Sequence, residues 1–196
     1  MKIEPIVLMG SQVCLVPLSR VHVADLAIAG NQASIWTYMR NGTVDSPEKM
    51  LDFVENLLEL QARGTDQPFA VIHLPTAKAI GMTRYIGIDP ANRSLEIGGT
   101  WYGVEYQRSG VNSEAKLLLL QHAFETLGCI RVQFKTDLSN KRSQRAIERI
   151  GAVREGVLRD HIILPGGTIR SSVFFSILAA EWPAVKQRLT GLVRSY

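Results

Sequence analysis

The amino-acid sequence predicts a mixed α/β fold, with a central, partly splayed β-sheet and helices on both of its faces. Between residues 69 and 102, apolar segments alternate with tight turns, which predicts an antiparallel meander. From residue 101 to 137 a strand end, a glycine-bearing turn, a helix and a second strand follow one another, and two strands joined through a helix are most simply parallel. We therefore expect one sheet that contains both antiparallel and parallel pairs.

The composition indicates a single domain over residues 1–196. Hydrophobic residues make up 46% of the chain, enough for a substantial core, and neither a linker nor an internal repeat interrupts it. The formal net charge of +4 is compatible with an anionic cofactor. Without a dense basic arm, it does not predict nucleic-acid binding.

Other features of the chain bear on its location. Cys14 and Cys129 form no metal-binding spacing, so we interpret them as buried thiols in a reducing compartment and expect no metal. The N-terminal M-K-I-E-P-I-V-L-M-G contains too short an apolar run for a signal peptide. No segment approaches the ~20 apolar residues of a membrane span. We therefore expect a cytoplasmic protein that does not bind a membrane.

The N-terminal third is predicted to hold one strand and two helices. The apolar run Val13–Leu18 is typical of a strand, and Val21–Ala29 has the pattern of a helix. Ser46 can cap a second helix, with Pro47 in its first turn and apolar residues at amphipathic spacing as far as Arg63.

The middle of the chain is predicted to form the meander. Its strands are Phe69–Leu74, Ala79–Ile88 and Ser94–Tyr102. Pro75-Thr76 and the segment Asp89–Arg93 supply the turns between them.

The turn Gln107–Ser113 lies where the third meander strand ends and a helix begins. Such a turn directs unpaired backbone N–H groups at one point, backed by the positive end of the helix dipole, so it suits a phosphate. Gly110 lets the backbone approach a ligand closely, although a glycine turn before a helix is also common without any ligand. Asn112 or Ser113 can cap the helix, and Glu114 is favourable in its first turn.

The helix after this turn is expected to be buried. It continues through a leucine-rich run to Leu127, is apolar on all sides, and has Gly128 as a natural stop. The alternating strand Arg131–Asp137 follows, and then a second helix. Between Arg131 and Arg149, six basic residues minus two acidic ones give a net charge of +4. A solvated helix face usually explains such a cluster, but this one directly follows the proposed phosphate-binding unit.

The C-terminal part is predicted to be a hairpin and a helix. Val153–Leu164 and Thr168–Leu178 form the hairpin around a Pro165-Gly166-Gly167 turn. The final helix begins near Trp182-Pro183.

Four motifs in this order resemble the core of the GCN5-related N-acetyltransferases, the GNAT superfamily. They are the Q/R-x-x-G-x-G/A turn at Gln107–Asn112, the N-x-x-S segment Asn140–Ser143, the turn Ile150–Ala152, and V-R-E-G-V-L-R at Val153–Arg159. The last is similar to the branch of the ribosomal-protein N-terminal (Rim-type) acetyltransferases. Each motif alone is weak, but with its flanks the resemblance covers nearly the whole chain.

The resemblance implies that acetyl-CoA binds as a cosubstrate. The implied binding residues are Trp101, Tyr102, Gly103, Gln107, Arg108, Ser109, Gly110, Val111, Asn112, Ser113 and Asn140. The backbone of Trp101–Gly103 would pair with the pantetheine arm like an added strand. The amides of Gln107–Ser113 would hold the pyrophosphate, with Arg108 as a charge partner. Asn112 replaces the usual Gly or Ala, so the turn is narrower or uses this amide as both cap and contact.

The resemblance also implies a catalytic base. Glu96 matches a glutamate that many relatives use, and one extra residue between Glu96 and Glu114 predicts a β-bulge that bears on its direction. The alternative is a strand glutamate that faces solvent. His161 is the second candidate, because histidine titrates in the useful range, although it can be only a packed residue. Asp160 and Glu105 are weaker candidates.

The residue that protonates the leaving thiolate differs from the family pattern. Ile147 stands where many GNAT enzymes place a tyrosine, so a tyrosine acid is excluded at that position. Ser143 is the nearest substitute, and Asn140 resembles the family asparagine near the cofactor arm. Either can instead simply cap the helix that follows Asp137.

Two functions follow from the resemblance. The first is an N-acetyltransferase that moves an acetyl group from acetyl-CoA to a primary amine by direct transfer in a ternary complex. The acceptor would be a protein N-terminus or a small amine. One wall of its site would include Trp36, Tyr38 and Met39, unless these residues pack in the core. The possibility of a homodimer is left open. The second is a non-catalytic acyl-CoA-binding or sensing protein, which the missing tyrosine permits. A dinucleotide-binding oxidoreductase fits poorly, because the chain has no G-x-G-x-x-G.

Overall fold

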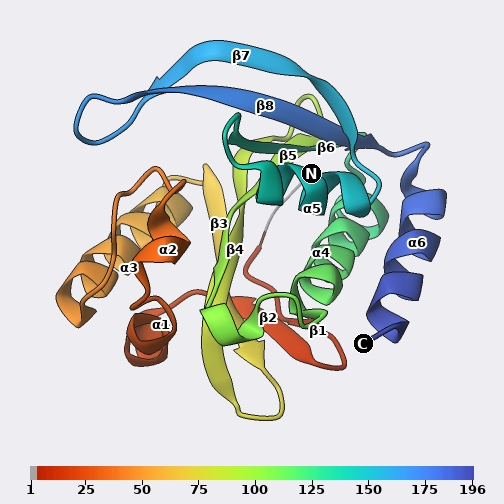
Figure 1. Ribbon diagram of the computed structural model, residues 1–196. Helices are drawn as coiled ribbons and strands as arrows, with labels where there is room; N and C mark the ends of the chain where they lie inside the picture. Colours follow the sequence, from red (N-terminus) through yellow and green to blue (C-terminus); the bar gives the residue numbers. More distant parts are fainter. Residues whose placement is uncertain (1–3) are drawn as a thin grey trace.

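The structure, a computed structural model, describes residues 4–196 as an eight-stranded sheet flanked by helices (Figure 1). The strands are β1 (Leu8–Met9), β2 (Val13–Pro17), β3 (Asp66–His73), β4 (Lys78–Asp89), β5 (Ser94–Tyr102), β6 (Arg131–Asp137), β7 (Val153–Ile163) and β8 (Ile169–Leu178). The helices are α1 (Val23–Ala29), α2 (Ala33–Trp36), α3 (Pro47–Ala62), α4 (Val111–Gln121), α5 (Lys141–Arg149) and α6 (Trp182–Arg194). The mixed, helix-flanked sheet that the sequence predicts is confirmed; β1 and α2 were not predicted.

The helices form a layer on each side of the sheet. In Figure 1, α1, α2 and α3 lie on one side and α4 and α6 on the other. Two hydrophobic clusters fill these layers: one includes Leu26 and Val54 from α1 and α3, and the other includes Leu119 and Val185 from α4 and α6. The β7–β8 hairpin reaches across the top of the view toward α2, where the Arg170 Nη1 donates to a backbone carbonyl 3.3 Å away.

The strands follow the order β1-β2-β3-β4-β5-β6-β8-β7. Strands β1 to β5 are neighbours in sequence order and pair antiparallel, which confirms the predicted meander and extends it to the N-terminal strands. The core side chains of β3 and β4, such as Phe69 and Tyr85, are fully buried because helices cover both faces of this part of the sheet.

Strands β5 and β6 form the one parallel pair of the described sheet. They pair only over three residues each, Ser94–Glu96 with Arg131–Gln133. Beyond Glu96, β5 continues along β4, whereas β6 continues along β8. The two strands therefore diverge, and β6 does not cover the edge of β5 from Ile97 onward.

A β-bulge interrupts β5 just after this point of divergence. The residues Gly99 and Thr100 face the single residue Thr83 of β4, because Trp101 pairs with Met82 and Gly98 with Arg84. The φ angle of Gly99 is +58°, which glycine adopts without steric cost. The predicted bulge between Glu96 and Glu114 is thus confirmed.

Two helix ends follow the predicted signals. Ser46 caps α3, since its hydroxyl accepts a hydrogen bond from the Lys49 backbone N at 3.3 Å. The leucine-rich run leaves α4 through a π-helical turn, His122–Thr126, and ends before Gly128, whose φ angle is +67°.

The predicted cap of α4 is wrong. The cap is Gly110, with a φ angle of +84°, and no side chain caps the helix; Asn112 and Ser113 lie within its first turn. Glu114 also does more than complement the helix dipole. Its carboxylate accepts hydrogen bonds from the backbone N of Ser11, Gln12 and Val13 at 2.7–2.8 Å, and so ties α4 to the start of β2.

The remaining expectations about the chain as a whole can be set beside the described residues. Of the N-terminal run considered as a signal peptide, residues 1–3 lie outside them. Cys14 and Cys129 are both buried. Within residues 4–196 no helix has the length and apolar character needed to cross a bilayer, and no group of His, Cys, Asp and Glu has a metal-binding arrangement.

Candidate active site

A cavity of about 490 Å³ opens where β5 and β6 diverge. It is bordered by the first turn of α4, the bulged part of β5, one side of α5, and the segment Tyr38–Asn41 that precedes α3. This cavity joins the two regions that the sequence singled out, the glycine turn and the strand that carries Glu96.

Most of the predicted site residues line this cavity. They are Glu96, Trp101, Tyr102, Gln107, Arg108, Ser109, Gly110, Asn112, Ser113, Asn140 and Ser143. Gly103 and Val111 do not: the Gly103 amide donates to the Ile80 carbonyl at 2.8 Å, and the Val111 side chain is buried in the core cluster under α4.

The glycine turn forms one end of the cavity. The first hydrogen bond within α4 runs from the Glu114 N to the Gly110 O at 3.0 Å, so the amides of the preceding turn point out of the helix end. A Cβ at Gly110 would lie 2.9 Å from the Tyr196 ring, and the positive φ angle would strain any other residue there. Both the backbone conformation and the nearby Tyr196 ring therefore require glycine at position 110.

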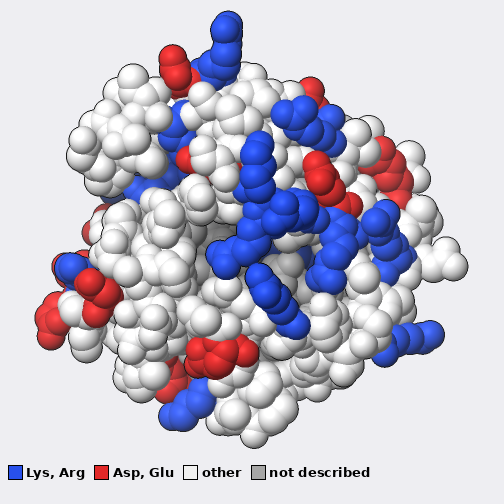
Figure 2. Space-filling model, viewed as in Figure 1, with Lys and Arg blue, Asp and Glu red and all other residues white. Residues whose placement is uncertain are grey.

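Basic side chains surround this end. Arg108, Arg142, Arg145 and Arg149 line it, and Figure 2 shows Lys and Arg side chains gathered beside a hollow on this face. The Arg142 Nη1 donates to the Gln107 Oε1 at 3.0 Å, and the Arg149 Nη2 donates to the Ser113 Oγ at 2.9 Å. These bonds hold two guanidinium groups from α5 at the start of α4. Helix amides and arginines together form a site suited to a phosphate group.

The edge of β5 leads from this end to the middle of the cavity. Because β6 has turned away, it does not pair with the backbone from Ile97 to Trp101, which can pair with an extended ligand on that edge; the Tyr102 carbonyl accepts a hydrogen bond from the Gln107 Nε2 at 3.1 Å. Trp101 and Tyr102 are buried, yet the Trp101 Nε1 and the Tyr102 hydroxyl lack a hydrogen-bond partner among the described residues. Buried polar groups normally have partners, so these two atoms are consistent with a polar ligand.

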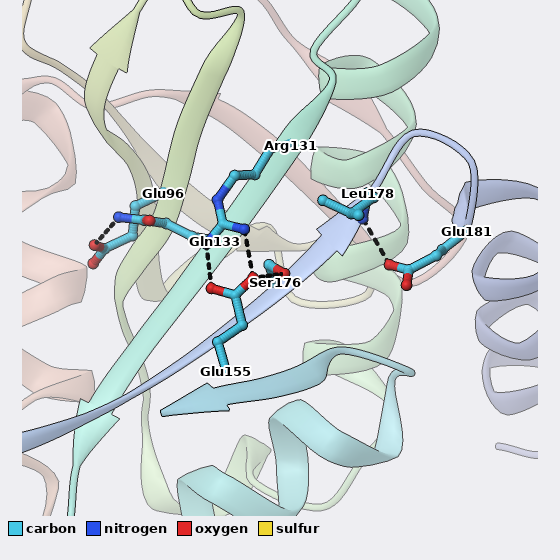
Figure 3. A network of polar contacts seen from close by, with 7 residues as sticks. All are labelled: Glu96, Arg131, Gln133, Glu155, Ser176, Leu178 and Glu181. Carbon is cyan, nitrogen blue, oxygen red and sulfur yellow. Dashed lines mark hydrogen bonds and ion pairs between the residues drawn. The ribbon is translucent and has the colours of Figure 1, made fainter. Parts of the chain in front are cut away.

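Glu96 lies at the other end of this edge. Its side chain is buried, and its Oε2 accepts hydrogen bonds from the Lys135 Nζ at 3.0 Å and the Gln133 Nε2 at 3.3 Å. Figure 3 shows Glu96 and Gln133 meeting across β5 and β6. The alternative of a solvent-facing glutamate is therefore wrong. A side chain on Gly98 would come within 2.8 Å of the Glu96 Oε1, so glycine at that position leaves room beside this oxygen.

A separate group of polar contacts begins at Arg131 on the same strand, β6. Figure 3 shows Arg131 donating to Glu155, which also accepts a bond from the Ser176 hydroxyl at 2.7 Å. The bonds from Arg131, at 2.6 Å and 2.5 Å for the two guanidinium nitrogens, hold β6 to the hairpin. They lower the pKa of the Glu155 carboxyl to about 2, so it stays ionised.

Helix α5 forms the opposite wall. The Asn140 side chain accepts a hydrogen bond from the Ser143 backbone N at 3.0 Å. Asn140 therefore caps this helix, which is the role that the sequence offered as an alternative to a cofactor contact. The two roles are compatible, because both residues also line the cavity. Ile147 also lines the cavity and is buried. This wall is therefore apolar at the position where the family pattern has a tyrosine.

The other base candidates do not line the cavity. The His161 ring lies against Phe174 at 5.4 Å between centroids, and Asp160 and Glu105 are exposed. Burial and the nearby cations Lys135 and Arg170 lower the pKa of His161. The geometry thus brings Glu96 to the cavity and leaves these three residues outside it.

The segment before α3 supplies the last wall. Tyr38, Met39 and Arg40 line the cavity, whereas Trp36 packs in the core against Trp101 at 5.0 Å between ring centroids. Tyr38 and Met39 thus lie where an acceptor wall is expected, and that role stays a prediction, whereas core packing is correct for Trp36.

Three cations at the cavity, the buried Lys116 and Arg170 and the partly buried Arg84, were not found from the sequence. Arg84 pairs with Asp66 at 2.9 Å, Arg170 pairs with Asp137 at 3.5 Å, and Lys116 lies against two threonines. Nothing in the local pattern marks them, because a charged residue on a strand or helix is normally exposed. Only the tertiary structure shows that these positions face a cavity.

A family model described as an acetyltransferase (GNAT) domain matches residues 12–153, from β2 to the start of β7. The chain belongs to the GNAT acetyltransferase family. The match includes the glycine turn, β5, β6 and α5, which supply most of the residues that line the cavity. Members of this family transfer acyl groups and use acetyl-CoA. Most of the β7–β8 hairpin and α6 lie beyond it.

Two relatives show how far this GNAT chain resembles known proteins. A provisionally named acetyltransferase of T. thermophilus is 36% identical, with a TM-score of 0.89 and all of both chains covered. YdaF of Bacillus subtilis, provisionally named a ribosomal N-acetyltransferase, is 34% identical over 106 residues. That match spans 54% of this chain and 57% of YdaF, so the chain covers little more than half the length of that relative.

A third relative shares the fold of this GNAT chain. RimJ of Mycobacterium smegmatis, whose structure is a complex with CoA-disulfide, is 20% identical and has a TM-score of 0.77, with 91% of this chain and 88% of that chain covered. At this identity the likeness to RimJ shows the fold alone, and the family model confirms the GNAT resemblance that the sequence indicated.

Proposed function

We propose that this protein is an N-acetyltransferase that moves an acetyl group from acetyl-CoA to a primary amine by direct transfer in a ternary complex. The observation that carries this proposal is one cavity lined both by a helix end suited to a phosphate and by a buried carboxylate. An acyl donor with a phosphorylated tail and an amine that must lose a proton need these two features in the same cavity.

The donor would bind through the backbone more than through side chains. The amides of Gln107–Ser113 would hold its pyrophosphate, with Arg108 and the arginines of α5 as charge partners. The uncovered edge of β5 would pair with the amides of the pantetheine arm. The orphaned Trp101 Nε1 and Tyr102 hydroxyl support a polar ligand along this edge.

Glu96 would serve as the base. An alkyl ammonium titrates near ~10 and an N-terminal amine near ~8, so a carboxylate accepting a proton directly or through water is chemically suitable. The Lys135 ammonium and the Gln133 amide hold one oxygen of Glu96 in place. The other oxygen lies beside Gly98, where an amine or a water molecule has room.

The thiolate side of the reaction has polar groups from α5. The Ser143 hydroxyl lines the cavity one helical turn before Ile147, so it can donate a hydrogen bond to the leaving sulfur. Its backbone N–H is already used by the Asn140 cap. The Ser143 hydroxyl takes no part in the helix cap, which was the alternative role for Ser143 in the sequence analysis.

Direct transfer is favoured over a covalent enzyme intermediate. A thiol nucleophile would have to line the cavity, and both Cys14 and Cys129 lie outside its described lining. Burial raises the pKa of the Cys129 thiol to about 11, which makes a thiolate there rare at neutral pH.

The acceptor is proposed to be a protein N-terminus or a small amine. YdaF carries a ribosomal acetyltransferase name, and Tyr38 and Met39 line the same cavity as Glu96, where such an amine would bind.

The alternative is a non-catalytic acyl-CoA-binding or sensing protein, which the isoleucine at position 147 favours. Purified protein incubated with acetyl-CoA and a panel of peptides and small amines separates the two. We expect release of free thiol with one class of amine and a matching mass increase of that amine. CoA binding without acetylation of any acceptor would support the sensing protein instead.

A further inference from the structure

Lys116 is a buried amine at the cavity that has no counter-charge. It lies on α4, its residue is 6% exposed, and it lines the cavity. Its Nζ donates to the Thr100 Oγ1 at 2.7 Å and lies 3.4 Å from the Thr83 Oγ1. No ion pair among the described residues includes it. An ammonium has three N–H donors, so two threonine hydroxyls leave one for a ligand.

Such a residue costs stability where it stands. The neighbouring residues of the buried face of α4, Ala115, Leu119 and Leu120, are apolar, and an apolar side chain would pack there without desolvating a charge. Burial lowers the pKa of Lys116 to about 7, so both of its protonation states are populated near neutral pH. A titratable group that is destabilising and faces a cavity is a candidate for chemistry.

Lys116 and Glu96 face the cavity from opposite sides of the sheet. Leu95 and Ile97 pack into the core cluster under α4, so Glu96, which alternates with them along β5, points to the other face. The Thr100 hydroxyl accepts a hydrogen bond from the Lys116 Nζ of α4, so beyond the bulge the strand turns this side chain toward α4. A base and an acid thus approach the uncovered edge of β5 from two separate directions.

We propose that Lys116 is the group that protonates the departing CoA sulfur, in place of the tyrosine that Ile147 replaces. As the bond between the acetyl carbon and sulfur breaks, its electron pair goes to sulfur. The Lys116 ammonium gives one Nζ proton to that sulfur and becomes a neutral amine, which regains a proton from water. The proton that Glu96 removes from the acceptor ammonium leaves to solvent. This proposal rests on the proposed acetyl transfer.

Acid strength favours Lys116 over the other donors at the cavity. An alkyl thiol such as cysteine titrates near ~8.5, and burial lowers the pKa of the Lys116 ammonium to about 7, so this ammonium is an acid of a strength matched to the departing sulfur. Burial raises the pKa of the Tyr102 phenol well above its usual range, so the same transfer from Tyr102 is uphill. A serine hydroxyl such as Ser143 can donate a hydrogen bond but is a far weaker acid.

The charged and titratable groups around Lys116 are already engaged. Glu114 on the same helix is bound to the start of β2, the Tyr85 hydroxyl of β4 donates to the Leu119 carbonyl at 2.8 Å, and Arg149 of α5 bonds Ser113. Tyr102 of β5 stays neutral. The protonation of Lys116 therefore follows its burial and whatever ligand occupies the cavity.

The first test needs no turnover. Free CoA is titrated on the wild type and on Lys116→Met, and the thiolate is followed by its ultraviolet absorbance. A nearby cation lowers the pKa of a thiol by about 1–3 units, so the bound thiolate should form at lower pH on the wild type than on the variant. Equal titration curves on both proteins would overturn the proposal. If the wild type acetylates no amine, the proposed function fails, and this titration still decides the role of Lys116.

The second test uses turnover across pH. We expect Lys116→Met to lower kcat roughly 10²–10⁴-fold, to leave KM for acetyl-CoA nearly unchanged, and to lose the basic limb of the kcat profile. Lys116→Arg should remain slow, because a guanidinium keeps its charge but does not release a proton. A wild-type rate in either variant would overturn proton donation by Lys116. Lys186→Met, which removes an exposed lysine paired with Glu125, is the matched control and should keep full activity.

A third variant keeps the lysine and guards against misfolding of the others. Thr100→Val conserves shape and removes the main acceptor of the ammonium proton, so the basic limb should move to lower pH. Lys116→Met should also unfold at a higher denaturant concentration than the wild type, because it removes a buried charge. A basic limb that Thr100→Val leaves in place, or that Tyr102→Phe abolishes, would assign the limb to another group and overturn the proposal.

Discussion

At the scale of single residues, the site depends on charged groups whose surroundings differ. Glu96 is held by Lys135 and Gln133, whereas Lys116 has only hydroxyl partners. Burial without a counter-charge destabilises the charged form of an amine, and the pKa of Lys116 is lowered for this reason. In the proposed reaction Glu96 accepts a proton and Lys116 donates one.

The role of Glu96 can be tested by an isosteric change. Glu96→Gln keeps the shape of the side chain and removes its basicity, so the rate constant should fall roughly 10²–10⁴-fold and the acidic limb of the pH profile should change. CoA affinity, measured by calorimetry, should barely move, because Glu96 lies at the far end of the cavity from the glycine turn. Glu148→Gln, on the exposed side of α5, is the control. A variant with an unchanged rate and acidic limb would remove Glu96 as the base, and loss of CoA binding would show a structural role.

Ser143 offers a cleaner separation of structure and chemistry than the sequence suggested. The cap of α5 uses the backbone N of Ser143, so Ser143→Ala should leave thermal stability unchanged. If the hydroxyl donates to the leaving sulfur, the variant should turn over more slowly while its CoA affinity changes little. Wild-type turnover in Ser143→Ala would show that the hydroxyl has no catalytic role and that residue 143 contributes only its backbone N to the helix cap.

At the scale of elements, α4 organises both the cofactor end and the core. Its first turn faces the cavity, its buried side packs under the sheet, and Glu114 fastens it to β2. A change at the start of α4 is therefore expected to affect binding or stability, depending on which of these contacts it removes.

Gly110 is the position where charge at the helix end can be tested. Gly110→Asp places a carboxylate where phosphates are proposed to bind, so it should abolish the rise in melting temperature that CoA produces. Any Cβ here also meets the Tyr196 ring and the positive φ angle. Gly110→Ala carries the same strain without the charge, and it should therefore keep more of the CoA-induced shift than Gly110→Asp. Equal shifts in the aspartate variant and the wild type would show that the phosphates bind elsewhere.

Glu114 is the position where the attachment of α4 can be tested. Burial alone would raise the pKa of its carboxyl, but the bonds from Ser11, Gln12 and Val13 together lower it. The stability it contributes is therefore present above the ordinary pKa of 4.5 and is lost as the pH falls through the lower, folded value. Glu114→Gln should cost roughly 2 kcal/mol in urea unfolding at pH 7, since charged hydrogen bonds are lost. The difference from the wild type should shrink below pH 4.5, and an equal difference at all pH values would contradict this account. The exposed Glu59→Gln is the control.

At the scale of the whole molecule, the cavity is shared by elements that are far apart in the chain. Its walls come from the segment before α3, from β5, from the start of α4 and from α5. A ligand in this cavity contacts most of the fold at once. We therefore propose that the chain unfolds as the single domain that its composition predicts.

Thermal unfolding with and without CoA tests this prediction. We expect one cooperative transition that moves upward as a unit. At a CoA concentration of about 100 Kd, mass action adds about 2.7 kcal/mol, which corresponds to about 5–10 °C for a chain of this size. Calorimetry checks both points. Two transitions, of which only one responds to CoA, would divide the chain into separate domains.

Local signals in the sequence were sufficient to predict most of the elements and much of their pairing, although not β1 and α2. Helix α3 begins after Ser46 and the leucine-rich helix ends before Gly128, as predicted, because caps and left-handed glycines act within one helical turn. The meander and the parallel β5–β6 pair follow from turn lengths and from the helix between two strands. The glycine turn at Gln107–Ser113 was found for the same reason, since its conformation depends on neighbours in the chain.

What these elements present to the cavity depends on contacts that form only in the folded chain. The ion pair of Glu96 joins two strands, the cap of α4 depends on the conformation of Gly110 beside the distant Tyr196, and Glu114 is bound to residues about 100 positions earlier. The partners of Lys116 are threonines of β4 and β5 that are brought together at the bulge. Burial and charge pairing are set by contacts between segments distant in sequence, and local periodicity carries no information about them.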